Sequence, residues 1–170
     1  YSYSKGEGSL LDKTVGSNSG ISKDKKTGTY SGGLTYDYDS IKGDVEFGVN
    51  SISELVPYIG IFGEYLSNSD PSSDNKGYLY GFKTGYQKVS EPLQWQIQVS
   101  NRKLEKDACL DILPDSDFYG GKTNVKGYEA AFSIGLYKNT LLNLDFYKTE
   151  NLSGHIVEEK LYQADLNYKF

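Results

Sequence analysis

Cysteine, histidine, methionine and proline are all scarce in this sequence: its 170 residues include one Cys, one His, no Met and four Pro. A single cysteine, Cys109, excludes an internal disulfide, and no Cys/His spacing resembles a metal-binding motif. The one histidine, His155, stands near Ser153 and Glu158 without a recognisable orienting group or oxyanion hole. We therefore expect no enzyme, no cofactor and no bound metal.

Long apolar runs and clustered positive charge are also missing. No stretch approaches the ~20 consecutive apolar residues of a transmembrane helix, and the mean hydropathy is -0.56. A net charge of -5 argues against nucleic-acid binding, which needs clustered Lys and Arg. The chain opens without Met or an apolar leader, so we expect a mature segment of a longer protein. These observations do not exclude a transmembrane β-barrel, because the apolar and polar residues that alternate along its strands cancel in any hydropathy average.

Aromatic and turn residues are abundant, with 16 Tyr, 7 Phe and 19 Gly, which is typical of β structure. Apolar and polar residues alternate along seven segments, and such alternation gives a strand one apolar and one polar face. The last segment shows it best: Tyr162, Ala164, Leu166 and Tyr168 share one face. The predicted strands lie within residues 41–50, 59–65, 78–87, 94–102, 128–136, 142–146 and 160–170.

The pattern slips by one residue between two neighbouring apolar series. The series from Tyr30 to Tyr38 has even parity, whereas the one beginning at Ile41 has odd parity. A tight turn at Asp39-Ser40 would make two strands, and a β-bulge would make one long bent strand. The bulge is favoured, because it leaves the Gly/Ser/Lys-rich residues 5–28 among the long external loops.

The face that is buried decides the environment of the protein. A soluble lipocalin-like barrel would turn its apolar face inward around a ligand, whereas a membrane barrel turns that face outward. Aromatic residues bracket two strands at positions eight apart, Tyr78 with Tyr86 and Tyr162 with Phe170. At ~3.3 Å per residue and a tilt of ~40° this spacing spans ~20 Å, close to the ~25 Å apolar band of outer-membrane barrels. We interpret the apolar face as facing lipid.

The connections support this orientation, because short ones (residues 89–92 and 138–140) alternate with long ones (68–76, 103–124 and 150–159). Short periplasmic turns and long external loops are typical of outer-membrane barrels. We therefore predict an all-β fold, an antiparallel transmembrane β-barrel with seven to eight strands present, as part of a larger barrel. Residues 1–29 are expected to form a strand end and loop, and residues 30–170 the barrel strands.

Several short stretches resemble the outer-membrane porin family of Gram-negative bacteria, over residues 30–170. They are Ile61–Tyr65, Gly77–Gly81, Arg102–Ala108, Asp115–Phe118, Gly120-Gly121 and Gly127-Tyr128. Cys109 stands where that family usually has an aliphatic residue. Tyr168 and Phe170 look like the terminal signal read by the barrel-assembly machinery.

The resemblance implies an integral outer-membrane protein whose water-filled channel passes small hydrophilic solutes by passive diffusion. A homotrimer is compatible with it, as is a plugged lumen. Two alternatives stay open: a non-conducting structural barrel serving as anchor or adhesin, and a soluble lipocalin-like barrel.

Polar residues of the predicted strands would line the lumen. Acids outnumber bases among them, which is compatible with a cation preference or with mutual pairing across strands. The expected lining residues are Lys42, Asp44, Glu46, Glu64, Lys83, Gln96, Gln98, Arg102, Glu129, Asp145, Asp165 and Lys169.

The long segment 104–122 is the candidate constriction loop, with Asp107, Asp111, Asp115 and Asp117 as its acids. Folded inward, it would narrow the pore; as an ordinary external loop, it would stay in water. A further hypothesis is that calcium binds at Asp111, Asp115 and Asp117, although their spacing is not that of an EF-hand.

Overall fold

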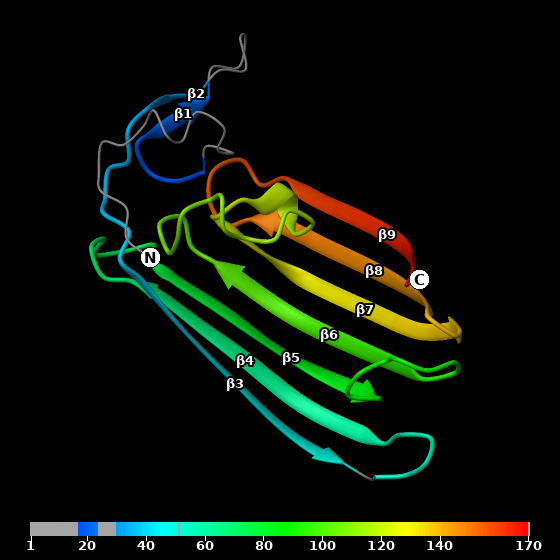
Figure 1. Cartoon of the computed structure of the whole chain (residues 1–170). Helices are drawn as coiled ribbons and strands as arrows, with labels where there is room; N and C mark the ends of the chain where they lie inside the picture. Colours follow the sequence, from blue (N-terminus) through cyan, green and yellow to red (C-terminus); the bar gives the residue numbers. More distant parts are fainter. Residues whose placement is uncertain (1–16, 24–29, 51, 170) are drawn as a thin grey trace.

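The computed structural model describes residues 17–23, 30–50 and 52–169. Seven strands form one antiparallel sheet in which each strand pairs with its neighbours in sequence, from β3 to β9 (Figure 1). All seven predicted strands are confirmed. The sheet is open, with β3 and β9 at its two edges. The strands are β3 (Ser40–Asn50), β4 (Tyr58–Asn68), β5 (Lys76–Gly85), β6 (Trp95–Leu104), β7 (Val125–Tyr137), β8 (Thr140–Asn151) and β9 (Glu158–Tyr168).

The sheet has two chemically different faces, because the register keeps residues of equal type side by side. Pairs such as Phe47 with Ile61 and Ile97 with Phe132 lie on one face, whereas Asp44 with Glu64 lies on the other. Between β3 and β9 the register shifts only between Gly135 and Tyr137. The two surfaces are called here the apolar face and the polar face.

The apolar face is exposed rather than buried. Ile41 is 77% exposed, Phe47 67% and Tyr162 75%. A water-soluble sheet buries such a face, since a contiguous apolar surface in water is costly. The main buried cluster lies on the other side, where residues of the β6–β7 connection pack on Leu104, Val125 and Tyr147.

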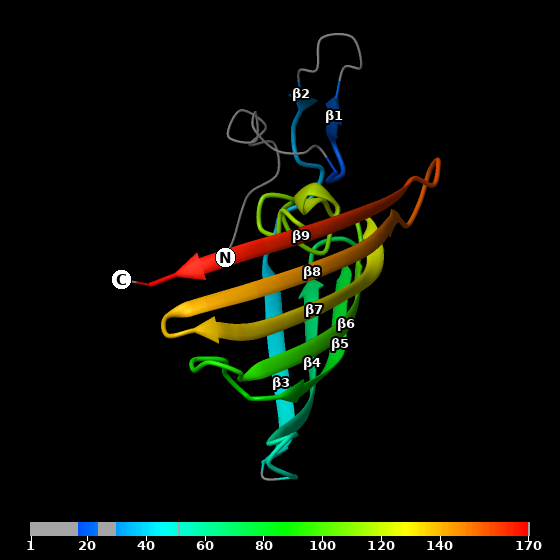
Figure 2. The ribbon, with the colours of Figure 1, turned by 90° about the vertical axis from the view of Figure 1, so that its right-hand side faces the viewer.

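The strands twist strongly from β3 to β9, so the two edges run in different directions (Figure 2). Residues 105–124 connect β6 to β7 at one end, called the long-loop end, and contain the 3-10 turn η2 (Tyr119–Gly121). At the opposite end, called the short-loop end, residues 138–139 connect β7 to β8. The connection 86–94 is longer than predicted, because β5 stops at Gly85, whose φ is 106°.

One apparent defect in the predicted pattern has a packing reason. Phe62 is an aromatic residue on the polar face of β4, opposite Gly81 of β5. A Cβ on Gly81 would collide with the Phe62 ring and with the carbonyl of Val99. The ring therefore covers backbone where a side chain is missing, which is how aromatic residues stabilise glycines in sheets.

The N-terminal segment differs from the predicted bulge. Strands β1 (Ile21–Lys23) and β2 (Tyr30–Gly32) pair with each other in a separate sheet, and residues 33–39 form no strand. Leu34 and Tyr38 pack with Leu110 of the long connection, which removes this stretch from the sheet. Neither a bulge nor a hairpin with β3 forms, because tertiary packing overrides the alternation.

Within these described ranges, no helix is long and apolar enough to cross a membrane.

Candidate pore-lining surface

The predicted lining residues share the polar face, as their register shows. Direct cross-strand neighbours include Asp44 with Glu64 and Ser100 with Glu129. Lys169 follows the last residue of β9, and its backbone N–H donates to the carbonyl of Asn139 (2.9 Å) at the short-loop end. The strand residues that share the face are Lys42, Asp44, Glu46, Glu64, Lys83, Gln96, Gln98, Arg102, Glu129, Asp145 and Asp165.

Two of the acids on β3 and β4 are matched by bases. Lys42 and Glu64 form an ion pair of 2.9 Å, and Lys83 and Glu46 form one of 2.7 Å. The hydroxyl of Tyr58 also donates to Glu46. Asp44 lies opposite Glu64 and makes no ion pair among the described residues, so this half carries two ion pairs across strands and one unpaired acid.

The half formed by β7 to β9 carries acids without such partners. Asp145 lies opposite Gln163 and Ala131, so Glu129 and Asp165 are its diagonal neighbours. Asp165 accepts a hydrogen bond from Gln163 (2.8 Å), and among the described residues neither Asp145 nor Asp165 makes an ion pair. Glu129, Asp145 and Asp165 are called here the acidic diagonal. It gives this wall a negative potential.

Residues 105–124 fold over the polar face rather than away from it. The ring of Phe118 lies 4.6 Å from the guanidinium of Arg102 and meets the Tyr147 ring edge-on, with 6.4 Å between centroids. Arg102 and Tyr147 both belong to the polar face. Both contacts are favourable, so Phe118 holds the loop against this surface.

The loop and the wall enclose a pocket of about 270 Å³. Leu113, Pro114 and Asp115 line it from the loop, and Lys42, Glu64 and Arg102 are among the residues that line it from the strands. A loop acid thus shares this pocket with charged residues of the polar face. This is the geometry expected of a constriction in a pore.

The four acids of the loop fall into two pairs. Asp107 and Asp111 are only 2% and 3% exposed, whereas Asp115 is exposed and Asp117 half-buried. Asp107 accepts hydrogen bonds from the hydroxyl of Tyr38 (2.6 Å) and from Ser19. Asp111 accepts from the backbone and hydroxyl of Ser17. The first pair therefore anchors the loop, and the second pair faces the solvent.

Asparagine completes this anchor in a way that the sequence did not reveal. The Asn18 amide donates to the carbonyls of Lys106 (2.8 Å) and Cys109 (2.9 Å), and Asn68 donates to those of Asp37 and Asp107. Both asparagines are buried. An Asn in a Ser/Gly-rich stretch normally predicts a turn, so nothing local marked these two as core residues.

Tyr38 is the centre of the anchor. Burial, the hydrogen bond to Asp107 and the nearby charge of Asp111 all raise the pKa of its hydroxyl above the usual value. The hydroxyl therefore remains a donor at physiological pH. We define the loop anchor as Asn18, Tyr38, Asn68, Asp107 and Asp111.

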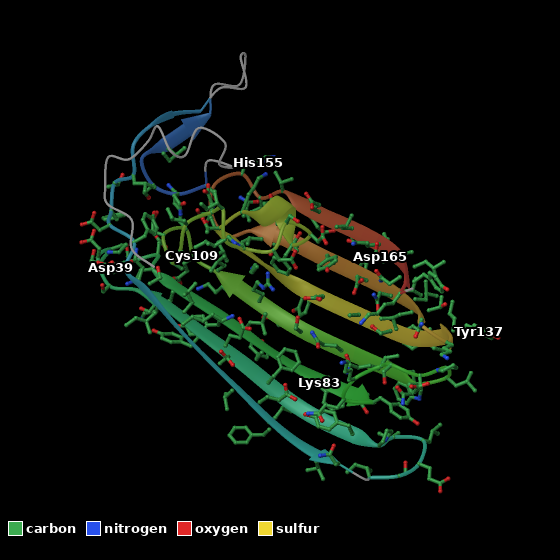
Figure 3. The ribbon with its side chains drawn as sticks, viewed as in Figure 1. Asp39, Lys83, Cys109, Tyr137, His155 and Asp165 are labelled. Carbon is green, nitrogen blue, oxygen red and sulfur yellow. The ribbon has the colours of Figure 1, made fainter. Side chains whose placement is uncertain are left out.

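The other predicted reactive residues are placed apart. Asp111 is bonded within the loop anchor, and no group of three or more His, Cys, Asp or Glu in the described part of the chain could hold a metal ion. The Ser153 hydroxyl donates to Asn124, and His155 contributes its carbonyl to Asn151. Figure 3 shows His155 and Cys109 toward the long-loop end and Tyr137 at the opposite end. Tyr168 of the predicted assembly signal is exposed, and Phe170 lies outside the described residues.

An open β-meander with an exposed apolar face and a polar, partly covered face has the features of a segment of a membrane barrel. A family model described as Putative porin matches residues 25–170, so the chain belongs to this family. No curated protein matches the chain. No solved structure matches it.

Proposed function

We propose that the chain forms part of a transmembrane β-barrel in the bacterial outer membrane, through which small hydrophilic solutes or ions diffuse passively. This proposal rests on one observation: the sheet is the inverse of one in a water-soluble protein. Its apolar face is exposed, and its polar face carries charged residues and is covered in part by the loop. Family membership supports the same function. Lipid takes the place of water on the apolar face.

Closure follows from the chemistry of the strand edges. The backbone groups on the outer edges of β3 and β9 have no partner strand within the described sheet. In hydrocarbon each such group would cost several kcal/mol, so further strands must join these edges into a ring. The polar face then becomes the wall of the lumen, and residues 105–124 narrow it from the long-loop end.

The acidic diagonal favours cations. Fixed acids on the wall of a narrow pore attract cations and repel anions, and the loop acids Asp115 and Asp117 interact electrostatically with Asp145. The paired charges of β3 to β5 contribute little, because Glu46 and Glu64 each have their own lysine, which leaves Asp44, among the described residues, as the one unpaired acid of these three strands on this face. We propose a modest cation preference.

Liposome swelling with the full-length protein tests the proposed function. Vesicles containing the protein should swell in isotonic small sugars at rates that fall with sugar size, and the protein should migrate differently on gels before and after heating. A protein that shows the gel shift but no swelling would be a non-conducting anchor or adhesin. One that stays dispersed in detergent-free buffer would be a soluble barrel, and either result would contradict the porin function.

A further inference from the structure

Charged side chains on the apolar face occur only at the long-loop end. Strands β3 and β4 present none on this face, and from β5 to β9 every outward charge lies within the last residues next to the long-loop connections. Five lysines, called here the outer lysine row, dominate the set. They are Lys76, Lys103, Lys126, Lys148 and Lys160, accompanied on the strands by Glu150 and Glu158.

The register places lysines directly against lysines. Lys103 lies opposite Lys126, and Lys148 lies opposite Lys160. Like charges at directly opposite positions of an antiparallel pair are destabilising. The same register sets Lys126 opposite Glu150 and Glu150 opposite Glu158, so the negative charge on this rim comes first from glutamates of the neighbouring positions.

Glutamates balance only part of the positive charge of the row. Lys103 pairs with Glu105 (2.8 Å) and Lys126 with Glu150 (3.0 Å), whereas Lys148 and Lys160 share Glu158 at 3.2 Å each. Three glutamates thus form ion pairs with four of the five lysines, and five lysines outnumber three glutamates. Each of these pairs is solvent-exposed on at least one side, so the lysines remain accessible to an additional anion.

The order of residues along the strands indicates where that anion lies. Moving from the apolar band toward the long-loop end, Lys103 of β6 comes before Glu105 of the connection that follows, Lys148 of β8 before Glu150, and Lys160 of β9 before Glu158. On these three strands the lysine is nearer the apolar band, whereas Lys126 of β7 lies level with Glu150. On their own strands Tyr78 and Tyr128 lie two residues nearer the apolar band than Lys76 and Lys126. Across the strand pairs they lie level with Lys103 and Lys148.

This layering matches the layering of a lipid leaflet. Acyl chains meet the apolar band, aromatic rings meet its boundary, and the next layer outward is the headgroup. Lysine stems can lie along apolar surface while the ammonium reaches the interface. On β8 and β9 the glutamates lie two residues farther out than Lys148 and Lys160, so these two lysines are nearest the acyl chains.

We propose that the outer lysine row binds the phosphates of anionic, phosphorylated lipids in the leaflet at the long-loop end. The long-loop ends of β6 to β9 lie side by side (Figure 1), so one phosphate can approach lysines from adjacent strands. Charge complementarity selects this occupant, because a neutral headgroup would leave the opposed lysines unrelieved. The inference rests on the proposed insertion of the barrel in a membrane, although not on the open pore.

Native mass spectrometry of the full-length protein in detergent tests the row, with bis-phosphorylated lipid A as probe and the fully dephosphorylated lipid as its match. The wild-type protein should retain the phosphorylated lipid more strongly than the dephosphorylated one. Attraction of about 1 kcal/mol per lysine near an anionic surface predicts a loss of about thirtyfold in K148Q/K160Q and in K103Q/K126Q, because each variant removes two lysines. The control K88Q/K138Q removes two exposed lysines at the short-loop end and should retain lipid as the wild type does.

Salt provides a second measurement that needs no variant. Retention of the phosphorylated lipid by the wild type should fall as salt rises to about 1 M, where the Debye length is ~3 Å. Equal retention of both lipids by the wild type, or unchanged retention by the two row variants, would overturn the proposal. Channel recordings of the same samples separate the two claims: lipid selectivity without conductance would contradict the pore alone, and conductance without lipid selectivity would contradict the row alone.

Discussion

Asp145 and Asp165 differ from Glu46 and Glu64 of the polar face in their surroundings. Glu46 and Glu64 each have a lysine within 3 Å, whereas these two aspartates face amide and apolar neighbours across the strands. A paired acid contributes little net potential to a lumen, and an unpaired one contributes most of its charge. Ion selectivity therefore depends on few of the residues that share the face.

D145N/D165N should move the ratio of cation to anion permeability toward unity, because it removes two charges of the acidic diagonal and preserves side-chain size. Reversal potentials across planar bilayers with unequal salt on the two sides measure this ratio. E54Q/E91Q is the matched control, since both acids lie in exposed short-loop-end connections. An anion-favouring potential in the wild type would contradict the cation preference.

The second prediction at the residue scale concerns Tyr38. Y38F removes one hydroxyl that donates to buried Asp107, and loss of such a bond costs about 1 kcal/mol or more. We expect trypsin to cleave faster at Lys106 and Lys122 of the loop. The control Y137F alters an exposed tyrosine at the short-loop end, and equal cleavage rates in the two variants would show that Tyr38 does not anchor the loop.

Strands and loops differ in how far the sequence predicts them. Alternation is a local pattern set by the extended backbone, so all seven strands of the sheet could be predicted, and only their ends shifted. The loop anchor joins residues 17–19 to residues 105–111, which are distant in sequence, and no local period reports such a contact. The segment around Tyr38 was predicted as strand for the same reason: its alternation serves packing on Leu110 instead.

Adjacent positions of β6 test the assignment of the two faces. Val99 lies on the apolar face and Gln98 on the polar face, near the middle of the strand. A lysine facing mid-membrane lipid costs about 2–4 kcal/mol, so V99K should lower the unfolding free energy of the inserted protein by that amount. Q98K should change it little. Denaturant unfolding in vesicles measures both, and equal losses would mean that the faces are not in different solvents.

At the scale of the whole molecule, three layers follow one another along the proposed membrane normal. The apolar band covers the centres of the strands, and the outer lysine row borders this band at the long-loop end. The anchored loop, residues 105–124, covers part of the polar face. Each layer uses one face or one end of the same seven strands. All three features require the same arrangement, in which water contacts the polar face and lipid the apolar face.

Cysteine labelling of the full-length protein in intact vesicles tests that arrangement most directly. In a C109A background, Gln98→Cys should react with a charged, membrane-impermeant thiol reagent and lose conductance as the reagent occupies the lumen. Val99→Cys, the next residue on the apolar face, should neither react nor change conductance. Labelling at 99 together with protection at 98 would contradict the account.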